Sequence, residues 1–387
     1  MSQNIYCGRG TNVAYTDFMD LINESFGFHE PEQNFLYLLP KCYREEYRPQ
    51  DSNYVVIDED GALTTAVGAY DHELVVCGRR IPCRGIGNVG VHPDHRSKGH
   101  MKMAMDQSLA DMIADGIALS TLGGRRQRYQ YFGYDKAGPF YSFEVSSQNA
   151  RHALKDYGQG YTVREITDPA DPVIDEIMAL NAAQPVNPVR PRDRYLDIAN
   201  SWHARLLVIA QSERFVGYCI GNHHGSVSEL QIVRDEDIMD VLKALYDFYN
   251  GAYHIGLPPH QAAYIHALEP IAESLNLGIA MHFNILNYRL VTEAFLALKQ
   301  TYTDLPDGEM TLLIHGYAGD ERIRVAIQNG IPSAEYIPDT TPVDYELTHL
   351  EAIAFLFSPF SPVRDCASAL ARQWLPLPIC MNRADEV

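Results

Sequence analysis

A short basic segment, residues 92–103, gathers cationic side chains around one glycine. Its residues of interest are Arg96, Lys98, Gly99, His100 and Lys102. Glycine lets a ligand approach the backbone closely, and a helix that begins here would add the partial positive charge of its N-terminus. So many donors within a few residues favour a pyrophosphate over a single carboxylate. The segment predicts an anion-binding loop, and the alternative is an ordinary basic turn.

The flanking residues predict the elements that position this loop. Residues 87–91 are short, apolar and β-branched, which is typical of a buried strand that ends before Pro93. Beyond the loop, apolar side chains recur at helical spacing over residues 101–113, and Gly116 provides a stop. The predicted local order is therefore strand, tight loop and helix.

Composition limits the possible partners. The chain has 387 residues, with 31 Lys plus Arg against 50 Asp plus Glu, so its formal net charge is −19. This length predicts two or three domains. The acidic balance argues against nucleic acid or an anionic membrane surface as a partner, and it would attract a small cationic substrate.

The cysteines and the apolar runs indicate the cellular compartment to expect. The seven cysteines form no C-x-x-C pair and are odd in number, so they predict neither a disulfide framework nor a thiolate zinc site. The first residues contain no apolar targeting segment, and no apolar run reaches membrane-spanning length. We expect a soluble, cytoplasmic protein without a membrane partner.

Residues 1–150 predict one α/β domain around the basic loop. Helices are expected at residues 16–26 and 31–39, and strands at residues 53–57, 63–70, 73–76 and 81–91. After the loop and its helix come a strand at 117–122, a Gly123-Gly124 break, a basic aromatic segment and a last strand at 138–145.

Residues 151–284 repeat this order in weaker form. Strands are expected at 206–210, 215–220 and 227–233, then a helix at 236–249, a strand at 263–266, a helix at 271–275 and a strand at 279–283. In place of the basic loop stands Arg234-Asp235-Glu236-Asp237, which has no glycine and three carboxylates that would repel a phosphate. We interpret this tract as a duplicated fold without an anion site.

Residues 285–387 predict a small sheet with helices on it. A helix is expected at 290–298, strands at 310–316, 323–327, 334–337 and 344–347, and helices at 349–357 and 363–374. The apolar segment 352–360 could line a lipid cavity or form a helix core. The fold class is thus mixed α/β in three units, and without a low-complexity linker we expect them to pack closely.

Two further patterns are weak site signals. Gly85, Gly87 and Gly90 match G-x-G-x-x-G, yet they fall inside a strand with no helix directly after it, so we expect no dinucleotide site. His92 and His95 have the spacing of metal ligands, but no cysteine is near. We expect them to cap the loop and predict no metal.

Residues 89–101, V-G-V-H-P-x-x-R-x-x-G-H-M, resemble the acyl-CoA pyrophosphate loop of the Gcn5-related N-acetyltransferases (GNAT). Residues 126–134, R-Q-R-Y-Q-Y-F-G-Y, resemble the tyrosine motif of the enhanced-intracellular-survival (Eis) type. The resemblance spans nearly the whole chain. It implies an active GNAT domain at 1–150, a degenerate GNAT-like copy at 151–284 and a domain similar to sterol carrier protein 2 at 285–387. It also implies a homo-oligomer, such as a hexamer.

The resemblance further implies an acetyl-CoA-dependent N-acetyltransferase that passes acetyl directly to an amine in a ternary complex. The backbone of Val89, Gly90 and Val91 would pair with the pantetheine arm, and Gly124 and Arg125 would lie near the pantetheine or adenine end. The pyrophosphate would be held by the loop residues Arg96, Ser97, Lys98, Gly99, His100, Met101 and Lys102. The acceptor would be aminoglycoside-like, polyamine-like or a lysine amine.

Two residues are implied for the chemistry. Tyr129 falls at the position of the general acid, and a phenol with a pKa near ~10 can protonate the expelled thiolate. Packing alone is the alternative for Tyr129, with Tyr131 and Tyr134 as fallbacks for the acid. The Eis type uses the free C-terminal carboxylate as base, here that of Val387. This chain departs from that type because it does not end on an aromatic residue, and a solvated tail is the alternative.

Other assignments stay open. Asp17, Glu24 and Glu30 on the first helices are further candidates for acceptor binding. Two rival functions come from other classes: a CoA-responsive binding or regulatory protein without turnover, and a lipid carrier that acts through the C-terminal domain.

Overall fold

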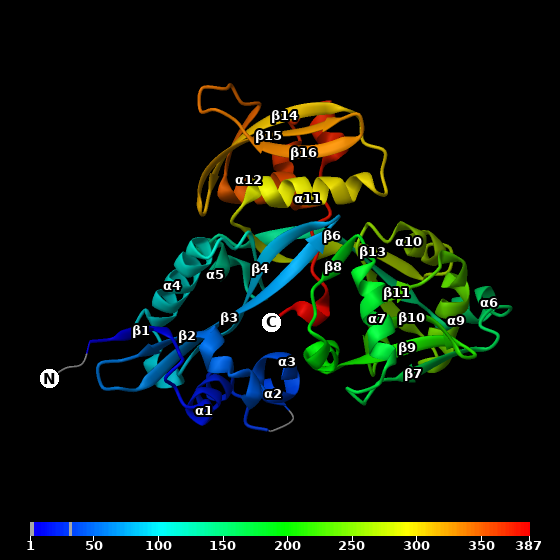
Figure 1. Cartoon of the computed structure of the whole chain (residues 1–387), viewed down its shortest axis with the longest axis horizontal. Coiled ribbons are helices and arrows are strands. Elements are labelled where there is room, and N and C mark those ends of the chain that lie inside the picture. The colour runs from blue at the N-terminus through cyan, green and yellow to red at the C-terminus, as the bar shows by residue number, and fades with distance from the viewer. Residues whose placement is uncertain (1–3, 31–32) are drawn as a thin grey trace.

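The computed structural model describes residues 4–30 and 33–387. Its main body is a 13-stranded sheet with the order β1-β2-β3-β4-β5-β13-β6-β12-β11-β10-β9-β7, and β8 pairs with β3 off this path. A separate four-stranded sheet stands above it in Figure 1. The fold is mixed α/β, as predicted. Among the described residues, none of the helices combines the length and the apolar character of a membrane-spanning segment.

The first unit places helices on both faces of its strands. The strands are β1 (Tyr6–Arg9), β2 (Asn53–Ile57), β3 (Leu63–Val76), β4 (Arg79–Val91) and β5 (Leu119–Leu122). The helices are α1 (Tyr15–Phe26), α2 (Phe35–Leu38), α3 (Pro40–Tyr43), α4 (His100–Ala114) and α5 (Arg126–Tyr129). Side chains alternate across a strand. In β2, Tyr54 and Val56 share a core with α4, whereas Val55 packs with α1 and α3, so these helices cover opposite faces.

The second unit also contains a parallel strand pair joined through a helix. Its strands are β7 (Tyr161–Glu165), β9 (Ala204–Gln211), β10 (Arg214–Asn222), β11 (Ser226–Ile232) and β12 (Tyr253–Leu257). Its helices are α6 (Ser147–Ala153), α7 (Val173–Ala182), α8 (Tyr195–Ala199), α9 (Ile238–Phe248) and α10 (Ala262–Leu268). β11 and β12 are parallel, as β4 and β5 are.

Three strands join the two units. β6 (Asp135–Val145) follows the first unit in sequence but pairs with β12, and β13 (Ser274–Ile285) ends the second unit but inserts between β5 and β6. β8 (Val186–Pro188) pairs with β3. The sheet therefore continues past residue 150, the predicted end of the first domain.

The third unit is a small sheet with helices packed on it. It comprises α11 (Tyr288–Gln300), β14 (Gly308–Gly316), β15 (Gly319–Gln328), β16 (Ile331–Tyr336), β17 (Tyr345–Thr348), α12 (His349–Phe357) and α13 (Ala369–Trp374). The apolar residues of α12, such as Phe355 and Phe357, are buried in the core. This packing favours a helix core over a lipid cavity for residues 352–357.

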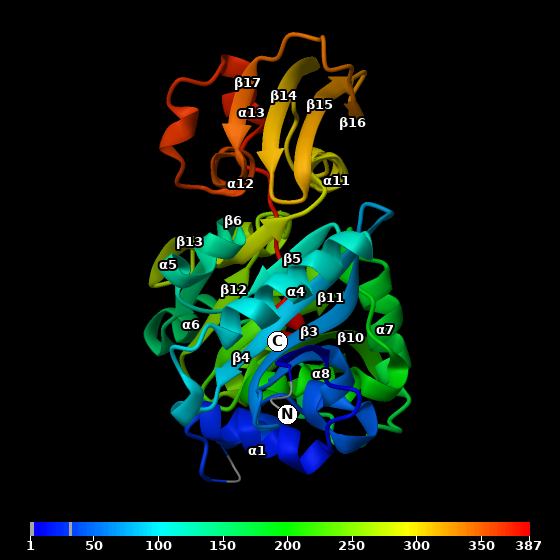
Figure 2. The same cartoon turned by 90° about the vertical axis from the view of Figure 1, so that its left-hand side faces the viewer.

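The chain after α13 returns to the main sheet. In both Figure 1 and Figure 2 the C-terminus lies in the middle of the molecule, beside the large sheet. Ala384 packs in a core of the second unit, and Val387 packs against a core of the first. The C-terminal segment, residues 380–387, therefore runs between these two units.

Several local predictions are wrong. The expected strand at 263–266 lies in α10, the expected helix at 271–275 overlaps the start of β13, and β12 was not anticipated. The residues of α10 include three alanines, which favour a helix. The helix expected at 31–39 is reduced to α2, and its first two residues lie outside the described chain.

Candidate active site

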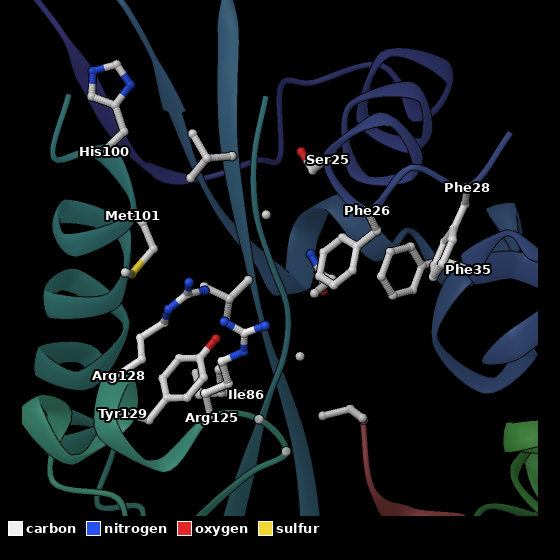
Figure 3. A pocket seen from close by; sticks show the side chains of 18 of the residues that line it. Ser25, Phe26, Phe28, Phe35, Ile86, His100, Met101, Arg125, Arg128 and Tyr129 are labelled. Carbon is white, nitrogen blue, oxygen red and sulfur yellow. The ribbon is translucent and has the colours of Figure 1, made fainter. Parts of the chain in front are cut away.

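A cavity of about 970 Å³ lies along β4, between the start of α4 and the α1–α2 region (Figure 3). It is lined by parts of five segments that lie far apart in the sequence, the last being the C-terminal one. Tyr129 and Val387 are both in the lining. So are all residues named above for the coenzyme: Val89, Gly90, Val91, Arg96, Ser97, Lys98, Gly99, His100, Met101, Lys102, Gly124 and Arg125.

The loop before α4 offers backbone donors to a ligand. Ser97 and Gly99 have positive φ values of 67° and 85°, and α4 begins directly after Gly99. An α-helix leaves its first N–H groups without a carbonyl partner of its own, here those of His100, Met101 and Lys102. With the positive end of the helix dipole, these groups form a site suited to an anion.

Three basic side chains of the loop differ in their partners. Arg96 donates to the Ser25 carbonyl (3.2 Å), and Lys102 pairs with Asp106. His100 is only 4% exposed, and its Nδ1 lies 2.8 Å from the Thr64 hydroxyl. Burial lowers the pKa of His100, which disfavours the positive charge predicted for this residue. Because the ring of His100 turns into the core, only the backbone of this residue can contact a phosphate.

The strand edge beside the loop is open. β4 pairs with β5 up to the residues Ile86 and Leu122. Beyond them, residues 87–91 keep their partner strand β3 on one side and have none of the described strands on the other. The cavity lies on that free edge. A free edge of N–H and C=O groups can pair with an extended amide-containing ligand.

Tyr129 is the tyrosine that faces this cavity. It is 7% exposed, and its ring packs so closely on Gly124 that a β-carbon there would lie 2.6 Å from the ring. Burial raises the pKa of Tyr129, and the neighbouring Arg128 opposes the rise. The two fallbacks are elsewhere: Tyr131 is 66% exposed, and Tyr134 is buried with its hydroxyl 2.6 Å from Ser120 Oγ.

Val387 reaches the cavity from the far end of the sequence. A β-carbon on Gly85 would come within 2.6 Å of Val387 Cγ2, and one on Gly87 within 3.1 Å of its carbonyl carbon. Any larger residue at these two positions would displace the tail. Two of the three glycines of the G-x-G-x-x-G match, Gly85 and Gly87, therefore provide the space for Val387.

Two side chains of the first and second units bind the backbone of the tail. Lys41 donates to the carbonyl oxygens of Ala384 (2.5 Å) and Glu386 (2.6 Å), and Trp202 Nε1 donates to that of Glu386 (3.1 Å). Lys41 is 7% exposed, and burial lowers its pKa. The two donors on one carbonyl fix the direction in which the chain enters the cavity.

A buried ion triad ties the tail to the second unit. Arg190 pairs with Glu229 of β11 (2.7 Å) and with Asp385 (2.8 Å), and all three side chains are at most 7% exposed. Burial raises the pKa of Asp385, but the Arg190 guanidinium outweighs it and holds the pKa below its ordinary value. Buried charges require such pairing, so this triad sets where residue 385 lies.

The other acidic candidates lie outside the cavity lining. Asp17 and Glu30 are exposed, and Glu24 pairs with His92 at 3.0 Å. His95 pairs with a different carboxylate, Asp58, at 3.2 Å. The described part of the chain gathers no group of three or more His, Cys, Asp or Glu side chains suited to a metal ion.

Some lining and anchoring residues had no individual signal in the sequence. They are Phe26, Phe28, Phe35, Lys41, Arg190 and Trp202. The glycines of β4 did carry a usable signal, since a glycine inside a strand indicates a bulge or a close approach. Lys41 and Ala384 are 343 residues apart, and no local pattern connects them.

Comparison with known proteins identifies the family of the first part of the chain. Residues 9–137 match the family model described as acetyltransferase (GNAT) domain. The chain therefore carries a GNAT acetyltransferase domain and is an acyltransferase. Proteins with this domain transfer acetyl from acetyl-CoA to an acceptor. No curated protein sequence is significantly similar to the chain.

Solved structures share the fold over nearly the whole chain. A GCN5-related N-acetyltransferase from Anabaena variabilis has a TM-score of 0.69 at 12% identity, with 98% of each chain covered. Eis1 from Mycobacterium abscessus has a TM-score of 0.62 at 15% identity, again with 98% of each chain covered. A probable N-acyltransferase from Enterococcus faecalis has a TM-score of 0.65 at 15% identity, with 98% of each chain covered. Identities this low show a common fold and no more.

Proposed function

We propose that the protein is an acetyl-CoA-dependent N-acetyltransferase that passes acetyl directly to the amine of a small cationic acceptor. One observation carries the proposal: a single cavity contains an open strand edge, a helix N-terminus, the buried Tyr129 and the last residue, Val387. The edge and the helix suit the donor, and the other two groups suit the chemistry.

The donor would bind along β4. Amides of its pantetheine arm would pair with the backbone of Val89, Gly90 and Val91, as an added strand does. The N–H groups of residues 97–102 and the side chains of Arg96 and Lys98 would hold the pyrophosphate. Gly124 and Arg125 would lie along the same arm.

The transfer would need one base and one acid. The ammonium of the acceptor gives a proton to the Val387 carboxylate, directly or through water. The amine nitrogen then bonds to the acetyl carbon, the carbon–sulfur bond breaks, and Tyr129 gives its proton to the sulfur. A second proton leaves the nitrogen as the amide forms and returns through water to the Tyr129 oxygen. The products are the amide, the CoA thiol and one proton.

Thiol release from acetyl-CoA in the presence of amines tests the proposal. We expect release that depends on both the amine and the enzyme, together with an acetylated amine in the mass spectrum. CoA binding without amine-dependent release would overturn the proposal and would indicate a regulatory CoA-binding protein instead.

The base assignment has its own test. One glycine added after Val387 moves the carboxylate away from Gly87, so we expect kcat to fall by about 10-fold or more while the KM for acetyl-CoA changes little. Intact-mass measurement of the unextended protein checks that its chain ends at Val387. An unchanged kcat in the extended protein would remove Val387 from the mechanism.

The remaining inferences rest on the resemblance. We infer that residues 151–284 are a degenerate GNAT copy, that residues 285–387 are similar to sterol carrier protein 2, and that the protein is a cytoplasmic homo-oligomer. Light scattering of the purified protein measures the oligomeric state.

A further inference from the structure

The cavity wall across from Tyr129 is aromatic. Phe26, Phe28 and Phe35 line it from the α1–α2 side, and their ring centroids lie between 5.0 and 5.8 Å apart. Figure 3 shows the three rings grouped on one side of the cavity and Tyr129 on the other. Leu38 extends this wall. Rings already in contact with one another form a preformed apolar surface for another ring.

Val387 packs against the same buried cluster as this surface. Its side chain, together with Phe28, Leu38 and Trp202, packs against one buried cluster that contains Phe35. The residue that carries the C-terminal carboxylate thus packs its own side chain among apolar residues. An amine held by that carboxylate would have its organic body against the aromatic wall.

The charges of the lining do not suit a polycation. Besides Arg96 and Lys98, which are assigned to the pyrophosphate, its cationic side chains are those of Lys102, Arg125, Arg128 and Arg383. Among the lining residues of the described chain, carboxylates occur only on Glu386 and at the end of Val387. Glu386 is paired with Arg383, whose guanidinium also lies 4.3 Å from the Trp202 ring centroid. One carboxylate remains for an ammonium group, although the whole chain carries −19.

We infer that the acceptor is a monoamine with an aromatic or similarly apolar body, an arylalkylamine in chemical terms. This inference rests on the proposed function and names its substrate class. It replaces the aminoglycoside-like and polyamine-like acceptors expected from the resemblance and the net charge. The ammonium meets the Val387 carboxylate, and the ring packs on Phe26, Phe28 and Leu38. A second or third ammonium would meet Arg383 and the apolar wall, where it would lose hydration without gaining a partner.

Three amines separate the possibilities in the thiol-release assay: 2-phenylethylamine, ethylamine and spermidine. We expect kcat/KM for 2-phenylethylamine to exceed both others by about 10-fold or more, as burial of an aromatic body provides. Equal values, or a preference for spermidine, would overturn the inference and leave an N-acetyltransferase standing. Absence of release with every amine would overturn the proposed function as well.

A variant at the wall links the preference to these residues. Phe26 is 45% exposed at the end of α1, so Phe26→Ala opens no closed core. We expect the ratio of kcat/KM for 2-phenylethylamine to that for ethylamine to fall about 5-fold or more. Phe360→Ala is the matched control, since Phe360 is 58% exposed in the third unit and should leave the ratio unchanged. An unchanged ratio in Phe26→Ala, with arylalkylamine preference intact, contradicts the assigned wall.

Discussion

The main sheet contains two parallel strand pairs, β4–β5 and β11–β12. In each pair the two strands stop pairing partway along their length, but the strand edges beyond that point differ. Beyond Ile86 the edge of β4 has no partner strand among the described residues. β11 and β12 pair only at two positions, and beyond them the edge of β11 is covered by side chains. Gln261 donates to the Leu230 carbonyl, and the Ile232 N–H donates to the Tyr264 hydroxyl, both at 2.9 Å. The second edge is therefore satisfied by the chain itself.

The helices that follow these strands, α4 after β4 and α9 after β11, differ in the charge at their N-terminal ends. α4 begins after Gly99 and has no carboxylate in its first turn. α9 follows Asp235, Glu236 and Asp237, and Asp237 is held by Arg214 at 3.0 Å. The hydrogen bond from Arg214 holds the pKa of Asp237 well below its ordinary value, although burial opposes this. A phosphate at α9 would meet negative charge.

The second cleft is lined by the C-terminal segment. A cavity of about 370 Å³ between β11 and β12 is lined in part by residues 380–383 and Glu386 of the C-terminal segment. The segment passes this cleft before it reaches the first one. The strand edge is thus free in the first cleft, whereas a stretch of the chain lines the second. Under the proposed function, the first cleft would bind the donor and the second would position the tail.

The largest effect is expected from removing Arg190, which ties Asp385 of the C-terminal segment to Glu229 of the second unit. Arg190→Met leaves Glu229 and Asp385 buried without a cation, which costs about 3–5 kcal/mol of unfolding free energy. Denaturant unfolding measures the loss. Because the tail loosens, we also expect a lower kcat at an almost unchanged KM for acetyl-CoA. Arg192→Met, at a partly exposed pair with Asp175, should cost within about 1 kcal/mol. Equal losses in the two variants would contradict a positioning role for the second cleft.

Removing the proposed acid should be the next largest effect. Tyr129→Phe keeps the packing on Gly124 but removes the proton donor, so we expect kcat to fall about 100-fold with little change in the KM for acetyl-CoA. Tyr131→Phe is the matched control, because Tyr131 is two residues away, exposed and outside the lining. Steady-state kinetics measure both variants. Full turnover in Tyr129→Phe would contradict the assignment of Tyr129 as the general acid.

The sequence was most informative where the interactions are local. The strand, loop and helix around residues 92–103 follow from a change in apolar period and a glycine, and both are readable without a structure. The side chain of His100 shows the limit. It stands among cations in the sequence, yet its ring bonds to Thr64, 36 residues away, and is buried. Only the packing of α4 on β3 decides that direction.

Non-local pairing explains most of what could not be predicted. β6 leaves the first unit to pair with β12, more than 100 residues later, and no pattern within either strand encodes this choice. The aromatic wall is assembled from α1, α2 and their flanks, and the tail beside it comes from the end of the chain. Net charge predicts a cationic acceptor but averages over the whole surface, whereas in the cavity lining the cationic side chains outnumber the carboxylates.

A charge reversal in the loop sharpens the comparison on the donor side. Lys98→Glu gives the first cleft the kind of charge that precedes α9, so we expect the KM for acetyl-CoA to rise about 10-fold, or ~1.4 kcal/mol, with kcat nearly unchanged at saturation. The matched control is Lys155→Glu at an exposed lysine of the second unit. Initial rates over a range of acetyl-CoA concentrations separate the two. A KM that stays constant in Lys98→Glu would mean that the backbone alone holds the pyrophosphate.

The smallest effect is expected from uncovering the second edge. Gln261→Ala frees the Leu230 carbonyl at a cost of about 1 kcal/mol in stability. We still expect one acetyl-CoA to bind per chain by calorimetry, because Asp235 and Glu236 remain before α9 and the C-terminal segment still lines the cleft. A second binding event would show that a single side chain had kept the cleft closed. In that case charge and the tail would not be what distinguishes the two clefts, and the covering of the strand edge alone would decide which of them takes the coenzyme.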